Sequence, residues 1–261
     1  MSRAEQKNGA RILSIDIETL PMLFYAWQPW EARALKVLED TSVCAWSAKW
    51  LGGRQITKCL ADYKGYKAHS RDDRKLLAEL WPLLDEADIV VAHNGKRFDV
   101  KKLNYRFMVL GLGVPSPYQV VDTLLEIKKV ASFDSHRLND LSQSLEIGQK
   151  VRTGGADLWF DCIEGKPAAW KRMKVYNARD VALLERLYLK IRPWMQGHPN
   201  MGLFSGLSCC PKCGSVKLQA RGWARSSTRS YQRFHCQACG GWAKGTESFR
   251  DKRASLTNIP R

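Results

Sequence analysis

The chain has 261 residues, 44% of them hydrophobic, and a formal net charge of +16 at pH 7. This length exceeds what one domain commonly needs, so we expect one α/β domain and a smaller module. A charge of this size favours a polyanionic partner, most simply nucleic acid. Because no apolar run approaches the roughly 18 residues of a membrane span and the first ten residues lack a signal-peptide core, we predict a soluble cytoplasmic protein without a membrane role.

The basic charge is concentrated near the C-terminus. Residues 208–261 hold 11 Lys and Arg against 2 Asp and Glu, whereas residues 1–207 hold 31 against 24. The composition changes between Gly197 and Gly206, a stretch that also contains a proline. Gly and Pro mark boundaries of this kind. We therefore predict an α/β domain at 10–196, a linker at 197–207, a small module at 208–245 and a basic tail at 246–261.

The run from Arg11 to Thr19 is aliphatic and β-branched apart from two acids, which predicts a buried strand. Asp16 and Glu18 are two residues apart, so a strand places both carboxylates on one face. Two like charges on a half-buried face are costly unless a cation neutralises them, and Mg²⁺ and Mn²⁺ prefer such oxygen ligands. By itself the pattern is equally consistent with solvated acids at the end of a strand.

The rest of the first 196 residues alternates strand-like and helix-like segments. The region from Trp27 to Trp30 is expected to be a loop. Further strands are predicted at 42–50 and 55–61, joined by a turn at Gly52-Gly53, and at 89–92. Helices are predicted at 70–84 with Ser70 as N-cap, 98–110 closed by Gly111, 123–130, 137–145 and 168–191. Strands followed by alternating strands and helices predict a mixed α/β sandwich.

A second acid, Asp99, begins the predicted helix 98–110, just after the sequence His93-Asn94-Gly95. Helical spacing places Asp99 on the same inward face as Leu103 and Phe107. An acid at the start of a helix is also favoured by the helix dipole alone. Asn94 is equally consistent with a turn residue, and His93 is interpreted as one.

A third acid, Asp180, lies inside the predicted helix 168–191. Tyr176 and Asp180 are four residues apart and are therefore neighbours on one helix face, which Leu184 and Leu187 continue. By itself Tyr176 would be an ordinary core residue. An acid on a core face is costly unless it is paired or bound to metal. One cation site would satisfy all three acidic segments together.

The three segments resemble the motifs of the DEDD 3′→5′ exonucleases, members of the RNase H-like superfamily that include DnaQ-like and polymerase proofreading domains. The matching residues are Asp16-Ile-Glu18-Thr, Asn94-x3-Phe98-Asp99 and Tyr176-x3-Asp180. The last motif resembles the tyrosine subtype, DEDDy, because the histidine subtype would carry His where this chain has Val175. The resemblance covers about residues 10–195 and implies an RNase H-like mixed β-sheet flanked by helices.

The resemblance also implies a two-metal mechanism of phosphodiester hydrolysis. In the family four carboxylates hold two Mg²⁺ or Mn²⁺ ions, and the matching residues are Asp16, Glu18, Asp99 and Asp180. Tyr176 is expected to orient the attacking water, because its ordinary pKa near 10 makes it a poor base. Asn94 would lie near the substrate strand. Asp122 is a further candidate at the margin of the site and is equally consistent with an N-cap of the following helix.

The C-terminal module contains two Cys-x2-Cys-Gly sequences, at Cys210 and Cys213 and at Cys236 and Cys239. Four thiolates at this spacing are typical of one structural, tetrahedral Zn²⁺ site. Cys209 and His235 adjoin the pairs, but using either as a ligand would break the two-residue spacing. The segment resembles a zinc ribbon, with strands expected at 216–223 and 230–235. A zinc ion would stabilise a module too small for a core of its own.

The predicted ribbon also interleaves cationic and aromatic residues, a pattern typical of phosphate contacts and base stacking. These residues are Arg221, Trp223, Arg225, Arg229, Tyr231, Arg233, Phe234, Trp242 and Lys244. Each of them alone is equally consistent with a small core and a soluble surface. We interpret the set as a nucleic-acid contact.

Together these features predict a metal-dependent 3′→5′ exonuclease that acts on nucleic acid. The substrate is expected to be single-stranded or to offer a 3′ end, and DNA is favoured over RNA. The ribbon is expected to aid nucleic-acid binding. Two alternatives remain open: a non-catalytic nucleic-acid-binding protein on the same scaffold, and a structure-specific endonuclease using the same site. Clustered acid brings no benefit to a protein that only binds nucleic acid. Nothing in the sequence identifies a protein partner.

Overall fold

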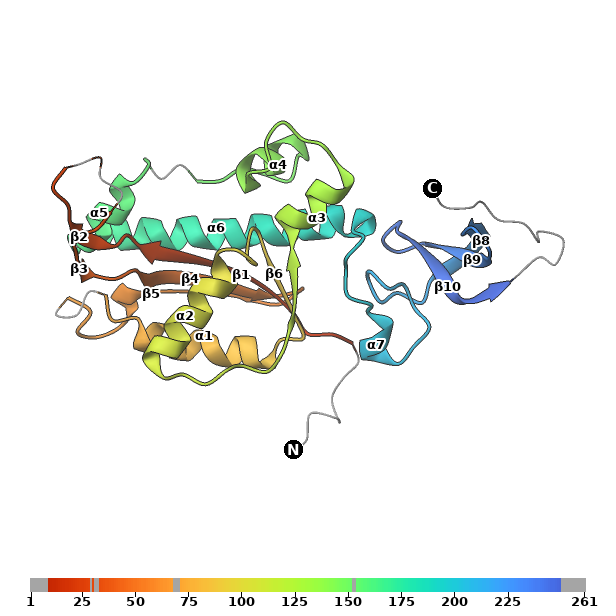
Figure 1. Cartoon of the computed structure of the whole chain (residues 1–261), viewed down its shortest axis with the longest axis horizontal. Helices are drawn as coiled ribbons and strands as arrows, with labels where there is room; N and C mark the ends of the chain where they lie inside the picture. The colour runs from red at the N-terminus through yellow and green to blue at the C-terminus, as the bar shows by residue number, and fades with distance from the viewer. Residues whose placement is uncertain (1–8, 29, 31–32, 68–70, 152–153, 250–261) are drawn as a thin grey trace. The chain divides into compact units, whose positions relative to one another are not determined.

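The computed structural model describes residues 9–28, 30, 33–67, 71–151 and 154–249 (Figure 1). The chain divides into two compact units, one formed by Arg11–Tyr188 and the other mainly by the residues from Leu189 onward. In the described part of the chain, no helix has the length and apolar character needed to cross a membrane.

The first unit is built on a five-stranded mixed sheet. Its spatial order is β5 (Gln55–Cys59), β4 (Ser42–Trp50), β1 (Ile12–Leu20), β6 (Ile89–Ala92) and β7 (Gln119–Asp122). The central strand β1 pairs antiparallel with β4 and parallel with β6, and β7 continues the parallel half. The predicted strands at 42–50 and 89–92 have these bounds, and the predicted turn joins β4 to β5.

Helices cover both faces of this sheet. In Figure 1, α1 (Arg74–Glu86) and α2 (Asp99–Leu110) lie on one side, and the long α6 (Pro167–Ile191) lies on the other. The remaining helices of the unit are α3 (Thr123–Val130), α4 (Leu138–Ser144), α5 (Asp157–Ile163) and a short 3₁₀ turn, η1 (Leu60–Asp62). The predicted fold class, an RNase H-like mixed sheet flanked by helices, is confirmed.

Apolar side chains of β1 and α1 fill the core between the layers. Leu13 and Ile15 of β1 are fully buried, as are Leu77 and Leu84 of α1. Leucines three and four residues apart along α1 give this helix one continuous apolar face against the sheet. Large buried aliphatic side chains each contribute on the order of 1.5–3 kcal/mol to folding.

The start of α1 differs from the prediction. The expected N-cap Ser70 lies outside the described residues, and the helix begins at Arg74 after Asp73. The Asp73 carboxylate is fully buried and accepts hydrogen bonds from Nε and Nη2 of Arg106, at 2.8 and 2.7 Å, and from the Val43 amide at 2.9 Å. This charged pair therefore ties α1, α2 and β4 together. Two parallel bonds make an Arg–carboxylate pair of this kind strong.

A small hairpin, which was not predicted, flanks the region from Trp27 to Trp30 that was expected to be a loop. The strands β2 (Leu23–Tyr25) and β3 (Lys36–Glu39) pair with each other, and every residue in them is exposed. Strands this short, without a buried face, give no alternation of apolar and polar residues for a sequence pattern to detect. β7 and α5 were also not predicted, because both are short: the strand has 4 residues, and the helix has 7, which is less than two turns.

The second unit contains a three-stranded antiparallel sheet in the order β10-β9-β8. Its elements are η2 (Arg192–Trp194), α7 (Gly202–Ser205), β8 (Leu218–Arg225), β9 (Ser230–Cys236) and β10 (Trp242–Phe249). The two predicted ribbon strands correspond to β8 and β9. The third strand was not predicted, and β10 continues to Phe249, four residues past the expected end of the ribbon at 245.

Candidate metal-dependent active site

The strand β1 presents two carboxylates beside α6. Ligand oxygens of Asp16 and Glu18 lie within 4.8 Å of each other and of an oxygen of Asp180. The register between β1 and β4 shifts between Glu18 and Thr19. Such bulges turn side chains beside functional sites. The predicted pairing of β1 acids with the acid of the last helix is thus present in the structure.

The helix α6 contributes Tyr176 and Asp180 to this cluster. Tyr176 lies one helical turn before Asp180, and the Asp180 charge raises the pKa of the Tyr176 hydroxyl in addition to the larger effect of burial. The ring of Trp159 packs edge-on against the ring of Tyr176, with centroids 6.0 Å apart. The ring of Tyr176 is thereby held by α5, on the same helix that carries Asp180.

A lysine outside the predicted motifs lies among these side chains. The Nζ of Lys150 pairs with Oδ2 of Asp180, and it lies 5.3 Å from the centroid of the Tyr176 ring. The Asp180 side chain is only 2% exposed, so this ammonium is the described cation nearest to its charge. Lys150 is in an irregular segment far from any motif, which is why no periodic pattern indicated it.

Asn177 is a second site residue that the sequence motifs did not predict. Its Nδ2 donates to Oδ2 of Asp16 at 2.6 Å and to the backbone oxygen of Asp16 at 3.2 Å. Asn177 is fully buried, and its Oδ1 has no hydrogen-bond partner among the described residues. The residue lies one position after Tyr176 in the last motif, so the spacing of acids alone gave no sign of it.

Asp99 is also on the inward face, at the first position of α2, as predicted. Its Oδ1 accepts a hydrogen bond from the Ile17 amide at 3.1 Å, so Asp99 contacts the segment of β1 between the two acids. Its oxygens do not belong to the group that lies within 4.8 Å. In this structure Asp99 therefore borders the three-carboxylate cluster and does not complete it.

Asp122 holds the loop that precedes α2. It is 2% exposed and accepts from the backbone amides of Asn94 at 3.0 Å and Lys96 at 3.1 Å. It also accepts from Leu124 and Leu125, so the predicted N-cap role is present as well. Asn94 has a backbone φ of 66°, a left-handed conformation that asparagine tolerates better than most residues.

The His93 ring has two hydrogen-bond partners. Its Nδ1 is 2.9 Å from Oγ1 of Thr123, and its Nε2 is 2.9 Å from the backbone oxygen of His136. These bonds join β6 to α3 and to the segment before α4. The structural interpretation of His93 fits this arrangement.

The carboxylates of the cluster have perturbed acidities. Burial, together with the charges of Glu18 and Asp99, raises the pKa of Asp16 well above its usual range. Burial and the charge of Asp180 raise the pKa of Glu18 to about 8, and burial raises the pKa of Asp99 to about 7. Burial also raises the pKa of Asp180, although Lys150 opposes the change. Negative charge here is therefore unfavourable without a cation.

The donor set fits hard divalent cations. Three carboxylates converge, and Oδ1 of Asp180 is buried without a hydrogen-bond partner among the described residues. Mg²⁺ and Mn²⁺ prefer carboxylate oxygens, and a metal bond would satisfy this atom. Asp16, Glu18 and Asp180 could hold such ions, and Asp99 lies beside them.

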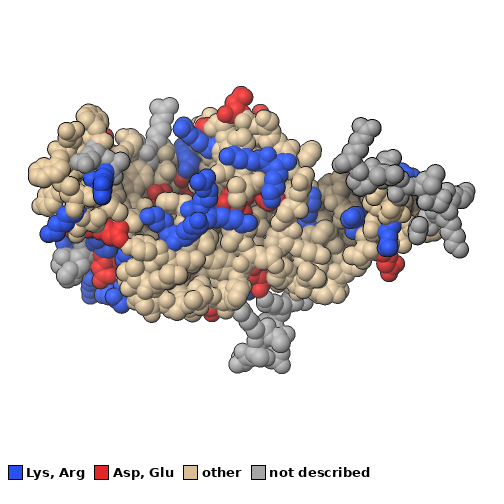
Figure 2. Space-filling model, in the orientation of Figure 1, with Lys and Arg blue, Asp and Glu red and all other residues tan. Residues whose placement is uncertain are grey.

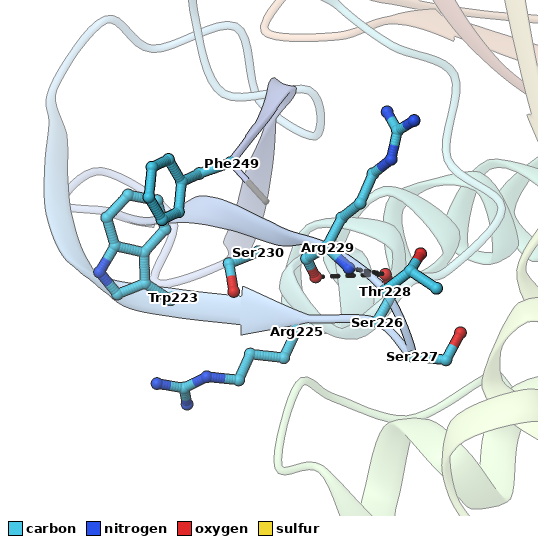
Figure 3. Close-up of a pocket in the computed structure, with 8 residues that line it drawn as sticks. All are labelled: Trp223, Arg225, Ser226, Ser227, Thr228, Arg229, Ser230 and Phe249. Atoms are coloured by element: carbon cyan, nitrogen blue, oxygen red, sulfur yellow. Dashed lines mark hydrogen bonds between the residues drawn. The ribbon is translucent and has the colours of Figure 1, made fainter. Parts of the chain in front are cut away.

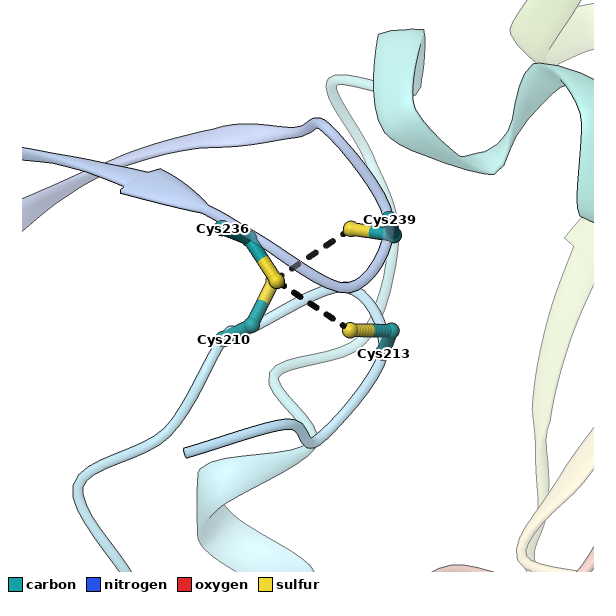
Figure 4. Close-up of side chains that lie close together, drawn as sticks. All are labelled: Cys210, Cys213, Cys236 and Cys239. Carbon is teal, nitrogen blue, oxygen red and sulfur yellow. Dashed lines mark hydrogen bonds between the residues drawn. The ribbon is translucent and has the colours of Figure 1, made fainter. Parts of the chain in front are cut away.

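The four predicted zinc ligands of the second unit form a separate cluster (Figure 4). The Sγ atoms of Cys210 and Cys239 are 3.8 Å apart, and those of Cys213 and Cys236 are 3.6 Å apart. A tetrahedral zinc site with Zn–S bonds of about 2.3 Å separates its sulfur atoms by about 3.8 Å. The cluster therefore has the dimensions of a four-cysteine zinc site.

Glycines and backbone amides shape the two cysteine turns. Gly214 and Gly240 follow the pairs with φ values of +77° and +76°, which glycine adopts without strain. Burial opposes ionisation of Cys236, but hydrogen bonds from the backbone at Cys239 and Ala238 prevail and lower the pKa of Cys236 to about 7. Cys209 is outside this cluster, and its Sγ is 3.8 Å from Oγ of Ser205.

One face of the ribbon sheet carries alternating cations and rings. The guanidinium of Arg233 lies 4.7 Å from the Trp242 ring, and Nζ of Lys244 lies 4.5 Å from the Tyr231 ring. His235 packs against the same Trp242 ring, with centroids 4.7 Å apart. The register of β9 with β10 places these five residues on a common face, which we call the cation–ring face.

Comparison with known protein families assigns the first unit. A model of the RNase H superfamily matches residues 30–192, well over half of the chain. The chain belongs to the RNase H superfamily. The matched residues of this chain include Asp99, Tyr176 and Asp180. The match begins after β1, which carries Asp16 and Glu18.

Two individual proteins to which the chain is similar are DNA polymerases. The chain is 33% identical over 76 residues to a DNA polymerase III PolC-type from Ureaplasma parvum, and this match covers 29% of the chain and 5% of that protein. Its structure is similar to that of the family B DNA polymerase from the hyperthermophilic archaeon Pyrobaculum calidifontis, with a TM-score of 0.53 and 17% identity. This likeness covers 84% of the chain and 31% of the polymerase chain, and it shows a common fold. The chain thus corresponds to a minor part of each.

Proposed function

We propose that this RNase H superfamily protein is a metal-dependent 3′→5′ exonuclease of the DEDDy type that acts on nucleic acid. The observation that carries the proposal is the cluster of Asp16, Glu18 and Asp180, with Tyr176 one helical turn before Asp180. Superfamily membership supports nuclease chemistry at a coarse level, and both proteins named above are DNA polymerases. Figure 2 adds that Lys and Arg side chains lie across the middle of the visible face of the α/β unit, with carboxylates between them.

In this proposal the residues of the cluster have distinct roles. Asp16, Glu18 and Asp180, with Asp99 beside them, would hold two Mg²⁺ or Mn²⁺ ions. When bound, such ions supply an activated water and stabilise the leaving 3′ oxygen. Burial and the neighbouring carboxylates raise the pKa of Tyr176, so its hydroxyl stays protonated and orients the attacking water as a hydrogen-bond partner. Asn94, in the loop held by Asp122, would position the substrate strand.

Lys150 favours one competing function. The Lys150 ammonium pairs with the buried Asp180 carboxylate and neutralises its charge. A protein that only binds nucleic acid, and holds no metal, would need such a partner for a buried acid. Under that alternative the three clustered carboxylates hold no metal, and the protein binds nucleic acid without cutting it. The same geometry also serves an endonuclease.

The deciding experiment uses 5′-labelled single-stranded DNA and RNA of one sequence. Wild type, Asp180→Ala and the exposed-acid control Glu79→Ala are incubated with Mg²⁺, Mn²⁺ or EDTA, and products are resolved at single-nucleotide resolution. A metal-dependent ladder shortening from the 3′ end, lost only in Asp180→Ala, supports the proposal and identifies the preferred sugar. Uncut substrate that is retarded on a native gel supports the binding alternative, and cutting of circular single-stranded DNA supports the endonuclease.

The ribbon is proposed to aid binding through its zinc-held sheet. The cation–ring face offers positive charge and flat rings to a polyanion. Asp16→Ala separates this binding role from catalysis, because it should abolish cleavage and leave retention of the oligonucleotide intact.

A further inference from the structure

The ribbon carries a pocket at the end of its sheet where β8 turns into β9 (Figure 3). It has a volume of about 400 Å³, within the range of small-ligand sites. The residues that line it are Trp223, Arg225, Ser226, Ser227, Thr228, Arg229, Ser230 and Phe249. None of these eight is acidic, and two are arginines.

Strand register explains why the pocket is hollow. Arg225 on β8 and Phe249 on β10 both pair with Ser230 on the middle strand β9. The three side chains therefore stand in one row across the sheet, and Trp223 shares their face because it is two residues from Arg225. The small Ser230 lies between large side chains, which leaves the depression. This face is opposite to the cation–ring face, since Ser230 and Tyr231 alternate along β9.

Two rings form one side of the pocket. The ring centroids of Trp223 and Phe249 are 6.4 Å apart with an interplanar angle of 44°, and the side chains are 46% and 59% exposed. Exposed rings that converge on a hollow offer a stacking surface to a flat ligand, which would remove their apolar area from water. On the opposite face, by contrast, the Trp242 and Tyr231 rings each lie against a cation.

The turn is closed by its own hydrogen bonds, and Arg225 at its start gives the pocket positive charge. The Ser226 amide donates to the Arg229 oxygen at 2.8 Å, and the Arg229 amide donates to Oγ of Ser226 at 3.1 Å, so the loop is closed on itself. Nη1 of Arg229 donates to Oγ of Ser248 at 3.0 Å. Because Ser248 pairs with Tyr231, this bond holds the Arg229 side chain toward the cation–ring face and leaves Arg225 as the cation beside the rings. A ligand that suits the pocket therefore combines a flat ring with negative charge.

We propose that this pocket binds one unpaired nucleotide of a single strand, with the base against Trp223 and Phe249 and the phosphate near Arg225. This inference deepens the proposed function and rests on it. Only an unpaired base has a free face to stack on a protein ring, because neighbouring bases cover the faces in a duplex. The ribbon is thereby assigned a preference for single-stranded substrate.

The test measures binding by the full-length, zinc-loaded chain in an Asp180→Ala background that prevents cleavage. Fluorescence anisotropy gives Kd for a 12-nucleotide oligothymidylate, for an abasic strand of equal length and for a blunt duplex. Stacking of one base is worth about 1–3 kcal/mol, so Trp223→Ala should weaken oligothymidylate binding by about tenfold and leave abasic-strand binding unchanged. Trp223→Phe should retain most of the affinity, and Ser230→Tyr, which fills the hollow, should lose it.

Trp194→Ala is the matched control, because Trp194 is a 70% exposed tryptophan outside the pocket. The proposal is overturned if Trp223→Ala binds oligothymidylate as wild type does, or if it weakens abasic and normal strands equally. Bound zinc, measured for each variant, shows that the ribbon is folded. The pocket and the nuclease are tested separately. If Trp223→Ala weakens oligothymidylate binding but the wild-type protein cuts no substrate, the pocket proposal is supported and the exonuclease proposal is wrong. If the wild-type protein cuts substrate but Trp223→Ala leaves Kd unchanged, the exonuclease proposal is supported and the pocket proposal is wrong.

Discussion

Nδ2 of Asn177 lies 2.6 Å from Oδ2 of Asp16, so a buried amide on α6 fixes the first carboxylate of β1. The same amide also binds the backbone oxygen of Asp16, and the helix therefore sets both the rotamer and the strand position. Asn177 itself carries no charge and reaches only one of the three clustered acids. It acts as a positioning residue for the proposed metal site.

Asn177→Ala should lower nuclease activity about 10- to 100-fold, because residues that orient metal ligands have effects of this size. If Asn177 positions a metal ligand, the variant should need a higher Mn²⁺ concentration for half-maximal activity. Saturating Mn²⁺ should then restore part of the lost activity. Metal titrations of initial rates measure this. Asn104→Ala, an exposed asparagine on α2, is the control, and a loss of activity that no metal concentration restores would contradict a positioning role.

Removing divalent metal should make stability fall with rising pH. In the folded protein burial and nearby charge raise the pKa of Glu18 to about 8, and burial raises the pKa of Asp99 to about 7, whereas these groups ionise near 4 when unfolded. The folded state thus binds protons more tightly, and this stabilisation is lost as pH rises through about 8. Thermal melts in EDTA from pH 5 to 9 should show the fall.

Mn²⁺ should counter this fall, since it binds the ionised carboxylates, and its effect on Tm should therefore be largest at high pH. Glu18→Gln should flatten the pH dependence in EDTA, whereas Glu79→Gln should preserve it. An equal Mn²⁺ effect at pH 5 and pH 9 would argue against carboxylate ligands.

Lys150→Gln should destabilise the metal-free protein at pH 8. The Asp180 side chain is almost completely buried. Removing the partner of a buried charge commonly lowers the free energy of unfolding by several kcal/mol. At about 2–4 °C per kcal/mol for a domain of this size, Tm would fall by about 6–20 °C, and added Mn²⁺ should close most of the gap. Lys58→Gln, which removes the partner of the exposed Glu79, should melt like wild type. A gap that persists in saturating Mn²⁺ would show that Lys150 is structural in the metal-bound state too.

Cys213→Ser should abolish the binding of one zinc per chain, measured by metal analysis of the purified protein. Without the ion the ribbon has few buried side chains to hold its three strands, so near-UV signals of Trp223 and Trp242 should weaken. Cys209→Ser should keep the zinc, because its sulfur is outside the cluster. Zinc loss in Cys209→Ser as well would indicate a different ligand set.

Several features could be predicted from the sequence because they depend on local spacing. Asp16 and Glu18 share a face through the two-residue period of a strand, and Tyr176 and Asp180 are neighbours through the helical turn. Each pair needs only one element to form. The cysteine pairs are local in the same way, since a two-residue gap closed by glycine forms a turn wherever it occurs.

The tertiary structure alone decided which uncharged or distant residues join these groups. Lys150 reaches Asp180 from an irregular segment, and Asn177 reaches Asp16 across the interface of α6 with β1. The hollow over Ser230 exists because three strands align Arg225, Ser230 and Phe249 in one row. Contacts of this kind depend on long-range packing and register, which no periodicity within one element records.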